Sequence, residues 1–426
     1  DEVSVAARLA ALLRAKPAFR PIVADKAVAW AEAKMGLTLA GAQCQALRMA
    51  VGEKVSVVTG GPGVGKTTII KALCAIFSAR RLRLFLAAPT GRAAKRMNES
   101  TGFQATTLHR LLKYQPQTGG FLYGLDNRIA GDVFIVDECS MLDAALTRRF
   151  LEALPDAATL ILVGDADQLP SVGAGNVLGD LIASGVIPCA RLTAIFRQDA
   201  SGYIVRNAHR VNQGEPFELP PPGHDSDFYF IEAADPAKAQ EIMLRMVTRR
   251  IPARFGLDPA RDVQVLTPMR RAELGTDRLN ERLQASLNPT GPALLRGSVA
   301  FRRRDRVMQI ANDYDKDVFN GDIGFVADAD PEARTLTVDF DGRLVTYKQD
   351  ELDELTLAYA CSIHKSQGSE YPAVVILLHT QHFKLLRKNL LYTALTRGKR
   401  LVVVIGSSKD RKSTRLNSSH VSISYA

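Results

Sequence analysis

The sequence predicts an α/β protein with two tandem halves built on parallel sheets, a small antiparallel β unit inserted in the second half, and a short helical N-terminal piece. Three observations support this prediction. A glycine-rich segment links an apolar run to a predicted helix. Apolar and polar residues alternate over residues 335–347 on both sides of Asp341-Gly342, as they do in a β-hairpin. Continuous β-branched and apolar runs also recur between helical stretches, as buried parallel strands do; they are residues 55–59, 82–88, 133–136, 159–163, 263–268, 373–378 and 401–405.

The order of these patterns predicts the domain organisation. We expect a helical piece at 1–38, a first α/β half at 39–198 with a projecting hairpin at about 114–130, an inserted β unit at 301–354, and a second half formed by 199–300 and 355–408. Residues 409–426 break sharply with what precedes them and resemble a translated sequencing adapter. We therefore exclude them from the fold.

Composition narrows the class of protein. The chain has 426 residues, enough for two or three domains, and a net charge of +10, which suits a polyanionic partner such as nucleic acid. No apolar run approaches the roughly 18 residues that a membrane span needs. Five scattered cysteines without a C-x-x-C pair argue against zinc or disulfides and indicate a reducing, cytoplasmic location. No leader pattern is visible, and the missing initiator Met indicates a fragment.

The glycine-rich segment matches the P-loop pattern G-x-x-x-x-G-K-[ST]. Its backbone N–H groups and the following helix N-terminus can surround phosphate oxygens, while Lys66 reaches the β- and γ-phosphates. The alternative is a glycine-rich turn without a ligand, which the flanking strand and helix disfavour. The expected nucleotide-binding residues are Gly60, Gly61, Pro62, Gly63, Val64, Gly65, Lys66, Thr67 and Thr68, with Gln43 upstream to read an adenine edge.

Further polar residues follow the next apolar runs. Asp137 and Glu138 end residues 133–138 as a Walker B pair does: Asp137, together with Thr67, is expected to hold Mg²⁺, and Glu138 to polarise the attacking water. Gln168 follows the third run, where its amide can sense the γ-phosphate. The alternative for the acidic pair is a helix cap after a strand.

Together these motifs resemble superfamily 1 helicases of the 5′-to-3′ class, most closely the RecD-like ATP-dependent DNA helicases, over residues 39–408. The matching segments are 60–68 for motif I, 88–94 for Ia, 137–141 for II, 164–172 for III, 196–198 for IV, 362–370 for V and 391–398 for VI. The resemblance implies two RecA-like P-loop NTPase domains and an SH3-like insertion entered at 317–324. It also makes residues 114–130 the pin that parts a duplex.

The resemblance also assigns roles to single residues. Arg197 would meet the γ-phosphate, and Arg397 would be an arginine finger that reaches ATP from the second half when the two halves close. We expect the catalytic set to be Lys66, Asp137, Glu138, Gln168, Arg197 and Arg397. The expected DNA contacts are Pro89, Thr90, Arg92, His109, His364, Lys365, Ser366 and Gln367.

The function implied is an ATP-dependent DNA helicase that moves 5′-to-3′ on single-stranded DNA and unwinds duplexes in repair or recombination. Its cofactors would be ATP and Mg²⁺, and its partners single-stranded DNA and single/double-strand junctions, as a monomeric motor away from membranes. Three alternatives remain at this point: the helicase portion of a conjugative relaxase, a non-unwinding ATP-dependent DNA-binding switch, and an RNA helicase.

Overall fold

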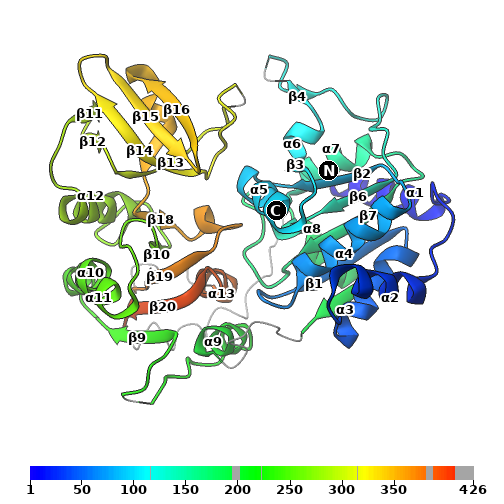
Figure 1. Cartoon of the computed structure of the whole chain (residues 1–426), viewed down its shortest axis with the longest axis horizontal. Coiled ribbons are helices and arrows are strands. Elements are labelled where there is room, and N and C mark those ends of the chain that lie inside the picture. The colour runs from blue at the N-terminus through cyan, green and yellow to red at the C-terminus, as the bar shows by residue number, and fades with distance from the viewer. Residues whose placement is uncertain (116, 194–201, 222, 314, 380–386, 408–426) are drawn as a thin grey trace, which may run out of the picture. The chain divides into compact units, whose positions relative to one another are not determined.

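The computed structural model describes residues 1–426 apart from 116, 194–201, 222, 314, 380–386 and 408–426. Its contacts divide the chain into two compact units, residues 1–200 and 201–426, which we describe separately (Figure 1). Within the described residues, no helix is both long and apolar enough to cross a membrane. The predicted adapter-like tail, residues 409–426, lies outside the described residues.

The first unit is built on a six-stranded parallel sheet with the order β3-β2-β6-β7-β1-β8. Its strands are β1 (Val55–Gly60), β2 (Leu84–Ala88), β3 (Ala105–Thr107), β6 (Val133–Val136), β7 (Thr159–Gly164) and β8 (Cys189–Leu192). The central strands β1, β6 and β7 are buried throughout, which explains their continuous apolar sequences. The predicted α/β class with parallel sheets is confirmed.

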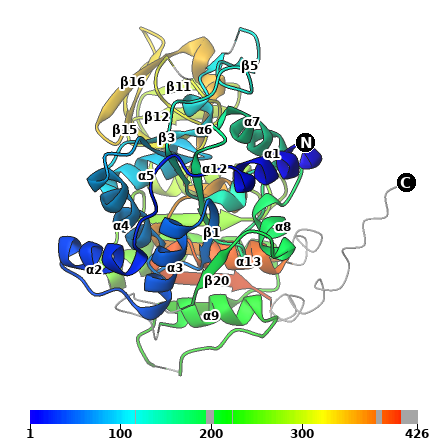
Figure 2. The same ribbon diagram turned by 90° about the vertical axis from the view of Figure 1, so that its right-hand side faces the viewer.

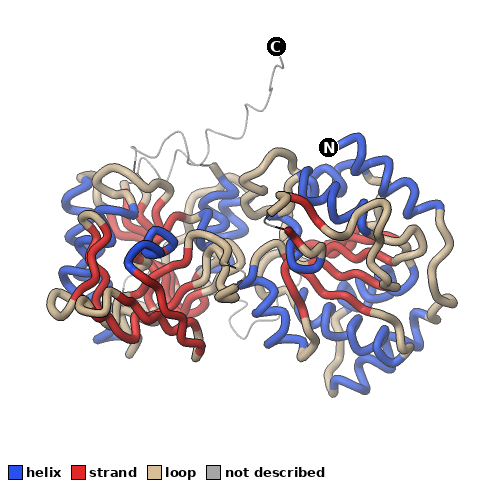
Figure 3. The backbone as a smooth tube through the Cα atoms, turned by 90° about the horizontal axis from the view of Figure 1, so that it is seen from above, coloured by secondary structure: helices blue, strands red, loops and turns tan. Residues whose placement is uncertain are grey.

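Helices cover both faces of this sheet (Figures 2 and 3). One face packs against α2 (Ala24–Met35), α3 (Gly41–Gly52), α4 (Lys66–Ala79) and α5 (Gly91–Thr101). The other packs against α1 (Glu2–Arg14), α6 (Leu108–Leu111), α7 (Ala144–Ala153) and α8 (Val177–Ser184). Successive strand residues point to opposite faces, so Ile135 meets the first helix layer and Phe134 the second. The two helices of the predicted N-terminal piece thus lie on different faces of the same sheet.

A short antiparallel hairpin follows α6. Its strands are β4 (Tyr114–Gln115) and β5 (Gly120–Phe121), with Tyr114 opposite Phe121 and Gln115 opposite Gly120. The hairpin lies within the segment predicted to project from the sheet.

The second unit has a five-stranded parallel sheet with the order β18-β10-β19-β20-β9. These strands are β9 (Phe228–Glu232), β10 (Val263–Thr267), β18 (Ala360–Ser362), β19 (Tyr371–Leu377) and β20 (Gly398–Gly406). Its helices are α9 (Tyr203–Asn212), α10 (Pro236–Arg245), α11 (Ile251–Phe255), α12 (Thr276–Leu287) and α13 (Lys388–Leu395). A π-helical turn, Met246–Arg250, joins α10 to α11 just before Pro252. A proline has no N–H for the regular ladder, so the wider turn accommodates it.

An antiparallel sheet is inserted in the second unit with the order β16-β15-β14-β13-β17. Its strands are β13 (Arg306–Gln309), β14 (Ile323–Asp330), β15 (Thr335–Phe340), β16 (Arg343–Lys348) and β17 (Leu355–Leu357). A hairpin of β11 (Ala293–Arg296) and β12 (Val299–Arg302) precedes it. The predicted antiparallel insertion is therefore present.

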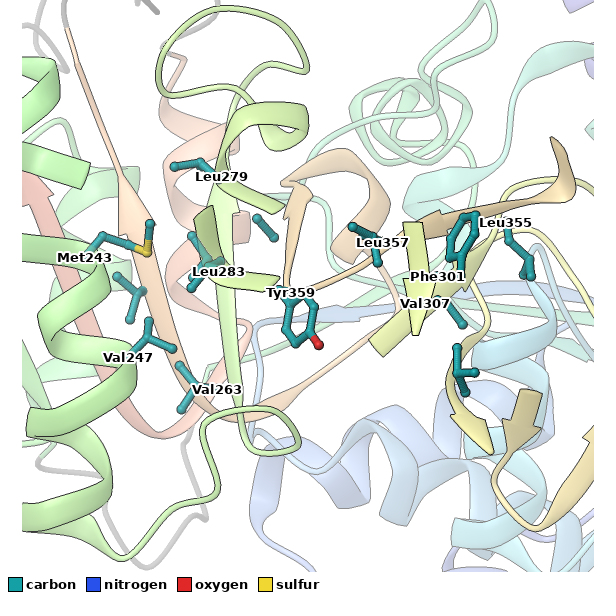
Figure 4. Close-up of a cluster of buried hydrophobic side chains, with 14 of the residues drawn as sticks. Met243, Val247, Val263, Leu279, Leu283, Phe301, Val307, Leu355, Leu357 and Tyr359 are labelled. Carbon is teal, nitrogen blue, oxygen red and sulfur yellow. The ribbon is translucent and has the colours of Figure 1, made fainter. Parts of the chain in front are cut away.

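The inserted sheet and the second α/β half share one hydrophobic cluster. Leu279 and Leu283 of α12 belong to the same cluster as Phe301 of β12 and Val307 of β13 (Figure 4). Because the apolar contact is continuous, the insertion and this half form one packed body.

Candidate nucleotide-binding site

The P-loop joins the carboxyl end of β1 to the N-terminus of α4. Gly65 caps α4 with a φ of +86°, a conformation that favours glycine. A Cβ at this position would also collide with Nε2 of Gln43. The loop thus turns tightly and leaves the first N–H groups of α4 available to an anion.

Lys66 lies folded back on the loop that precedes it. Its Nζ donates hydrogen bonds to the main-chain oxygens of Gly60, at 2.5 Å, and Gly61, at 2.8 Å. The side chain is half-buried. The ammonium is thereby held beside the loop by neutral main-chain oxygens, which charged phosphate oxygens can replace.

Asp137 and Glu138 directly follow β6, in the middle of the same sheet. Asp137 accepts a hydrogen bond from the N–H of Glu138, at 2.8 Å, and Glu138 has a φ of +54°. Burial, and next the Glu138 carboxylate, raise the pKa of Asp137 to about 6, while Lys66 and Arg96 oppose the rise. A buried carboxylate beside a second one favours a divalent cation, and hydroxyl and carboxylate oxygens are ligands that Mg²⁺ prefers.

Gln168 lies in the loop after β7. Its Nε2 donates to Oδ2 of Asp165, at 3.1 Å, and its buried Oε1 has no partner among the described residues. The N–H of Ala166 donates to Oγ1 of Thr59, at 3.2 Å, which ties this loop to the end of β1. The loop after β7 is therefore joined to the strand that leads into the P-loop.

Gln43 lies on α3, buried against the P-loop. Its Nε2 donates to the main-chain oxygen of Val64, at 3.3 Å, and its Oε1 accepts from the N–H of Ala40, at 3.0 Å. The structure thus brings the predicted adenine-reading amide to the loop, with both ends of the amide in hydrogen bonds.

The two expected arginines differ in what the structure describes of them. Arg197 lies outside the described residues. Arg397 is buried in the second unit, where its guanidinium donates to the main-chain oxygens of Thr393, at 3.1 Å, and Ser369, at 3.0 Å, and to Oγ1 of Thr396, at 3.3 Å. Its role towards a nucleotide in the first unit stays a prediction.

The expected DNA contacts of the first unit begin at the carboxyl end of β2. Pro89, Thr90 and Arg92 are half-buried there, and Thr90 caps α5 through a bond from the N–H of Ala93, at 3.3 Å. His109 lies instead against aromatic rings of the hairpin, and burial lowers its pKa.

The expected contacts of the second unit form the turn after β18. Burial lowers the pKa of both His364 and Lys365. Ser366 is buried, and its hydroxyl donates to the main-chain oxygen of Ile363, at 2.7 Å; Gln367 is buried as well. These roles stay predictions, and Lys365 is the most exposed member of the group.

Sequence reasoning missed two features of the nucleotide site. Arg96 was given no role in this site, yet its charge acts on Asp137. Thr59 was predicted only as a strand residue, although its hydroxyl orients the loop that carries Gln168. Only the order of the strands in the sheet, which places the ends of β1, β2, β6 and β7 along one edge, could have indicated either contact.

A P-loop and a pair of carboxylates at the carboxyl edge of one parallel sheet define the class of the P-loop nucleoside triphosphatases. The sequence matches the family models of an AAA domain at residues 43–174, an ATP-dependent RecD-like DNA helicase SH3 domain at 279–340 and a UvrD-like helicase C-terminal domain at 357–405. The second match covers most of the inserted sheet.

Comparisons over most of this chain identify the family. The chain is 39% identical to the ATP-dependent RecD2 DNA helicase of Deinococcus radiodurans over 404 residues, which cover 94% of the chain and 54% of that protein. It is 32% identical to the RecBCD enzyme subunit RecD of Mycolicibacterium smegmatis, over 86% of the chain and 71% of that protein. The chain belongs to the RecD-like family of ATP-dependent DNA helicases. It spans about half the length of the RecD2 relative.

Solved structures of another helicase share the fold. A Pif1 helicase from Bacteroides in complex with ADP-AlF3 and ssDNA matches with a TM-score of 0.53 and 19% identity, over 86% of this chain and 92% of that one. Pif1 from Candida albicans matches with a TM-score of 0.51 and 19% identity, over 89% and 97%. At this identity the likeness concerns the fold alone.

Proposed function

We propose that the chain is the motor part of a DNA helicase that hydrolyses ATP, moves 5′-to-3′ along single-stranded DNA and separates duplexes in repair or recombination. The observation that carries the proposal is the P-loop beside Asp137 and Glu138, in a chain of the RecD-like family. The net charge of +10 favours binding to DNA, which is a polyanion.

In the proposed reaction, ATP binds with its phosphates in the P-loop. Lys66 exchanges the main-chain oxygens of Gly60 and Gly61 for the β- and γ-phosphate oxygens. Thr67 and Asp137 would hold Mg²⁺, which neutralises charge on those oxygens when it is bound. Glu138 orients the attacking water, and the Oε1 of Gln168 has no partner in the described part of the chain and can accept from that water.

The arginines complete the proposed charge stabilisation. Arg197, at the end of the first half, and Arg397, from the second half, would approach the γ-phosphate, as the family resemblance implies. Arg397 would give up at least one of its bonds to Thr393, Thr396 and Ser369 to do so. Ser369 belongs to the segment that resembles motif V, so this exchange would link hydrolysis to the expected DNA contacts around Lys365.

Strand separation tests the proposal. Purified protein is given ATP, Mg²⁺ and duplexes with either a 5′ or a 3′ single-stranded tail. We expect separation of the 5′-tailed duplex and none of the 3′-tailed one. Lys66→Ala should abolish separation and leave DNA binding without ATP intact. Lys71→Ala, on the exposed face of the same helix, is the matched control and should keep wild-type activity.

Other outcomes of these assays would support other functions. DNA-stimulated ATP turnover without separation of either duplex would support a DNA-binding switch instead of a motor. Preference for an RNA track in competition would support an RNA helicase. Separation that survives Lys66→Ala would show that the nucleotide site is wrongly assigned.

A further inference from the structure

One of the polar contacts between the insertion and the second α/β half joins Asn320 to Lys365. Nζ of Lys365 donates a hydrogen bond to Oδ1 of Asn320, at 2.5 Å. Asn320 lies in the loop between β13 and β14, and Lys365 in the turn after β18. The insertion therefore reaches the segment that carries the expected DNA contacts of this half.

Asn320 is held firmly by its own loop. Its N–H donates to Oδ1 of Asn312, at 2.9 Å. The next residue, Gly321, has a φ of +99°, and its N–H donates to the main-chain oxygen of Gln309, at 2.8 Å. Because the backbone on both sides is bonded, the direction of the Asn320 side chain is restricted.

The loop is also anchored to the rest of the insertion. Nζ of Lys316 lies 3.1 Å from Asp313, 3.0 Å from Glu351 and 3.8 Å from Glu354, and 4.7 Å from the ring centroid of Tyr347. A partly buried network of this kind restrains a loop more than an isolated surface ion pair does. The loop and the inserted sheet are thus expected to move as one body.

Lys365 differs from the other cations around it. It lines a cavity of about 710 Å³ together with Arg270 and Arg296. Arg270 is paired with Asp277, at 3.2 Å, and Arg296 lies 3.9 Å from Asp353. Among the described residues, no carboxylate pairs with Lys365, whose partner is a neutral amide oxygen. Its charge is held in place without being neutralised.

We propose that Asn320 is a positioning residue that holds the Lys365 ammonium in the lining of this cavity, where it binds a phosphate of a single-stranded nucleic acid. The inference rests on the proposed function and assigns the insertion a part in it. A neutral acceptor fixes the ammonium and leaves its charge for the phosphate. A carboxylate at the same position would fix the ammonium and cancel that charge.

The salt dependence of single-strand binding shows whether the charge of Lys365 is available to a phosphate. The dissociation constant of a fluorescent oligo-dT is measured by anisotropy between about 50 and 200 mM salt, since each phosphate contact adds about 0.7 to the log–log slope for single strands. We expect Lys365→Ala to weaken binding about fivefold and to lower the slope by about 0.7. Asn320→Ala should weaken binding less, and the double variant should bind no more weakly than Lys365→Ala.

The decisive variant is Asn320→Asp. It retains an acceptor for Lys365 and should nevertheless lower the salt slope as Lys365→Ala does. A merely structural role for Asn320 would not change the slope. Thr346→Asp adds the same charge on the edge strand β16 and should bind as the wild type does. Thermal unfolding of each variant checks that it is folded.

Two results would overturn the inference: additive losses for Asn320→Ala and Lys365→Ala, or a wild-type slope for Asn320→Asp. If the wild type separates strands and either result is found, the inference alone fails. If the wild type binds no single strand at all, the proposed function fails and the inference with it.

Discussion

The side-chain amide of Gln43 donates a hydrogen bond to the main-chain oxygen of Val64, at 3.3 Å, so a residue of α3 supports the P-loop from outside it. The same amide accepts from the N–H of Ala40, at 3.0 Å. The P-loop is therefore fixed by its own glycines and by a neighbouring helix, and this support leads to the first prediction.

Gln43→Ala should weaken ATP binding. The variant loses both hydrogen bonds, and the buried Val64 oxygen and Ala40 N–H lose their partner. We expect the KM for ATP to rise about fivefold, which corresponds to about 1 kcal/mol for a lost hydrogen bond. Gln45→Ala, on the exposed face of the same helix, is the control. An unchanged KM for both variants would show that Gln43 plays no part in the site.

Glu138→Gln should slow hydrolysis and leave ATP binding nearly intact. The amide keeps the size of the side chain and loses the charge that polarises water. We expect kcat to fall by about 10² to 10⁴, as for loss of a general base. The dissociation constant for ATP, measured by fluorescent-nucleotide titration, should change less than about twofold. A loss of binding equal to the loss of rate would instead make Glu138 a binding residue.

Asp305 should hold the insertion against α12. This buried carboxylate accepts from Nε2 of Gln284, at 2.5 Å, Nδ2 of Asn288, at 2.7 Å, and the Tyr359 hydroxyl, at 2.9 Å. Asp305→Ala leaves these donors without their acceptor, so the free energy of unfolding of this unit should fall by about 3–5 kcal/mol. Asp328→Ala, on the exposed part of β14, should change it by less than about 0.5 kcal/mol. Urea denaturation measures both.

The Asp305 carboxyl group should also make the stability of this unit depend on pH, and its pKa gives the sign of the change. Burial raises the pKa of Asp305 above its ordinary value of 3.8, against the opposing effect of its hydrogen-bond donors. The folded state therefore binds this proton more tightly than the unfolded state does. The contribution of Asp305 to stability is greatest below pH 3.8 and declines as the pH rises through the folded pKa. The difference between the wild type and Asp305→Asn, measured from acid to neutral pH, should show this decline; a difference that grows with pH would contradict it.

His109 should fix the hairpin that follows α6. Its ring centroid lies 6.0 Å from that of Tyr114 and 5.8 Å from that of Phe121, residues that face each other across the hairpin. His109→Ala should speed amide exchange at Leu122 and Tyr123, whose N–H groups bond back to Lys113 and Leu112, by about tenfold. Strand separation should fall more than ATP turnover does.

His109→Phe is the control for the hairpin, because it retains an aromatic ring in the same place. It should keep both slow exchange and strand separation. If His109→Phe loses DNA binding as fully as His109→Ala does, the residue acts as the direct DNA contact that its sequence context predicts.

The sequence predicted those parts of the fold and site that depend on a few consecutive residues. The strands β1, β6 and β7 are buried on both faces, so their residues form continuous apolar runs, and the P-loop chemistry lies within nine consecutive positions. The short strands β3 and β8 were not predicted. They have three and four residues, and β8 is half-exposed at the edge of the sheet, so neither carries a distinct pattern.

Contacts between distant segments could not be predicted in this way. Asn320 and Lys365 are 45 positions apart, and their meeting depends on how the insertion packs on α12. The charge of Arg96 near Asp137 likewise depends on the neighbouring positions of β2 and β6 in the sheet. In each case the residue type allows several partners, and only the packing selects one.

The central claim is that ATP held at Lys66 is also acted on by Arg397. The most direct test is the DNA-stimulated hydrolysis rate of Arg397→Lys, together with its affinity for ATP and with the exposed Arg400→Lys as control. We predict a fall in kcat of about a thousandfold, as for loss of an arginine finger, with ATP affinity close to that of the control and with the variant still folded in thermal unfolding. A folded Arg397→Lys variant that hydrolyses ATP at the wild-type rate would contradict the claim.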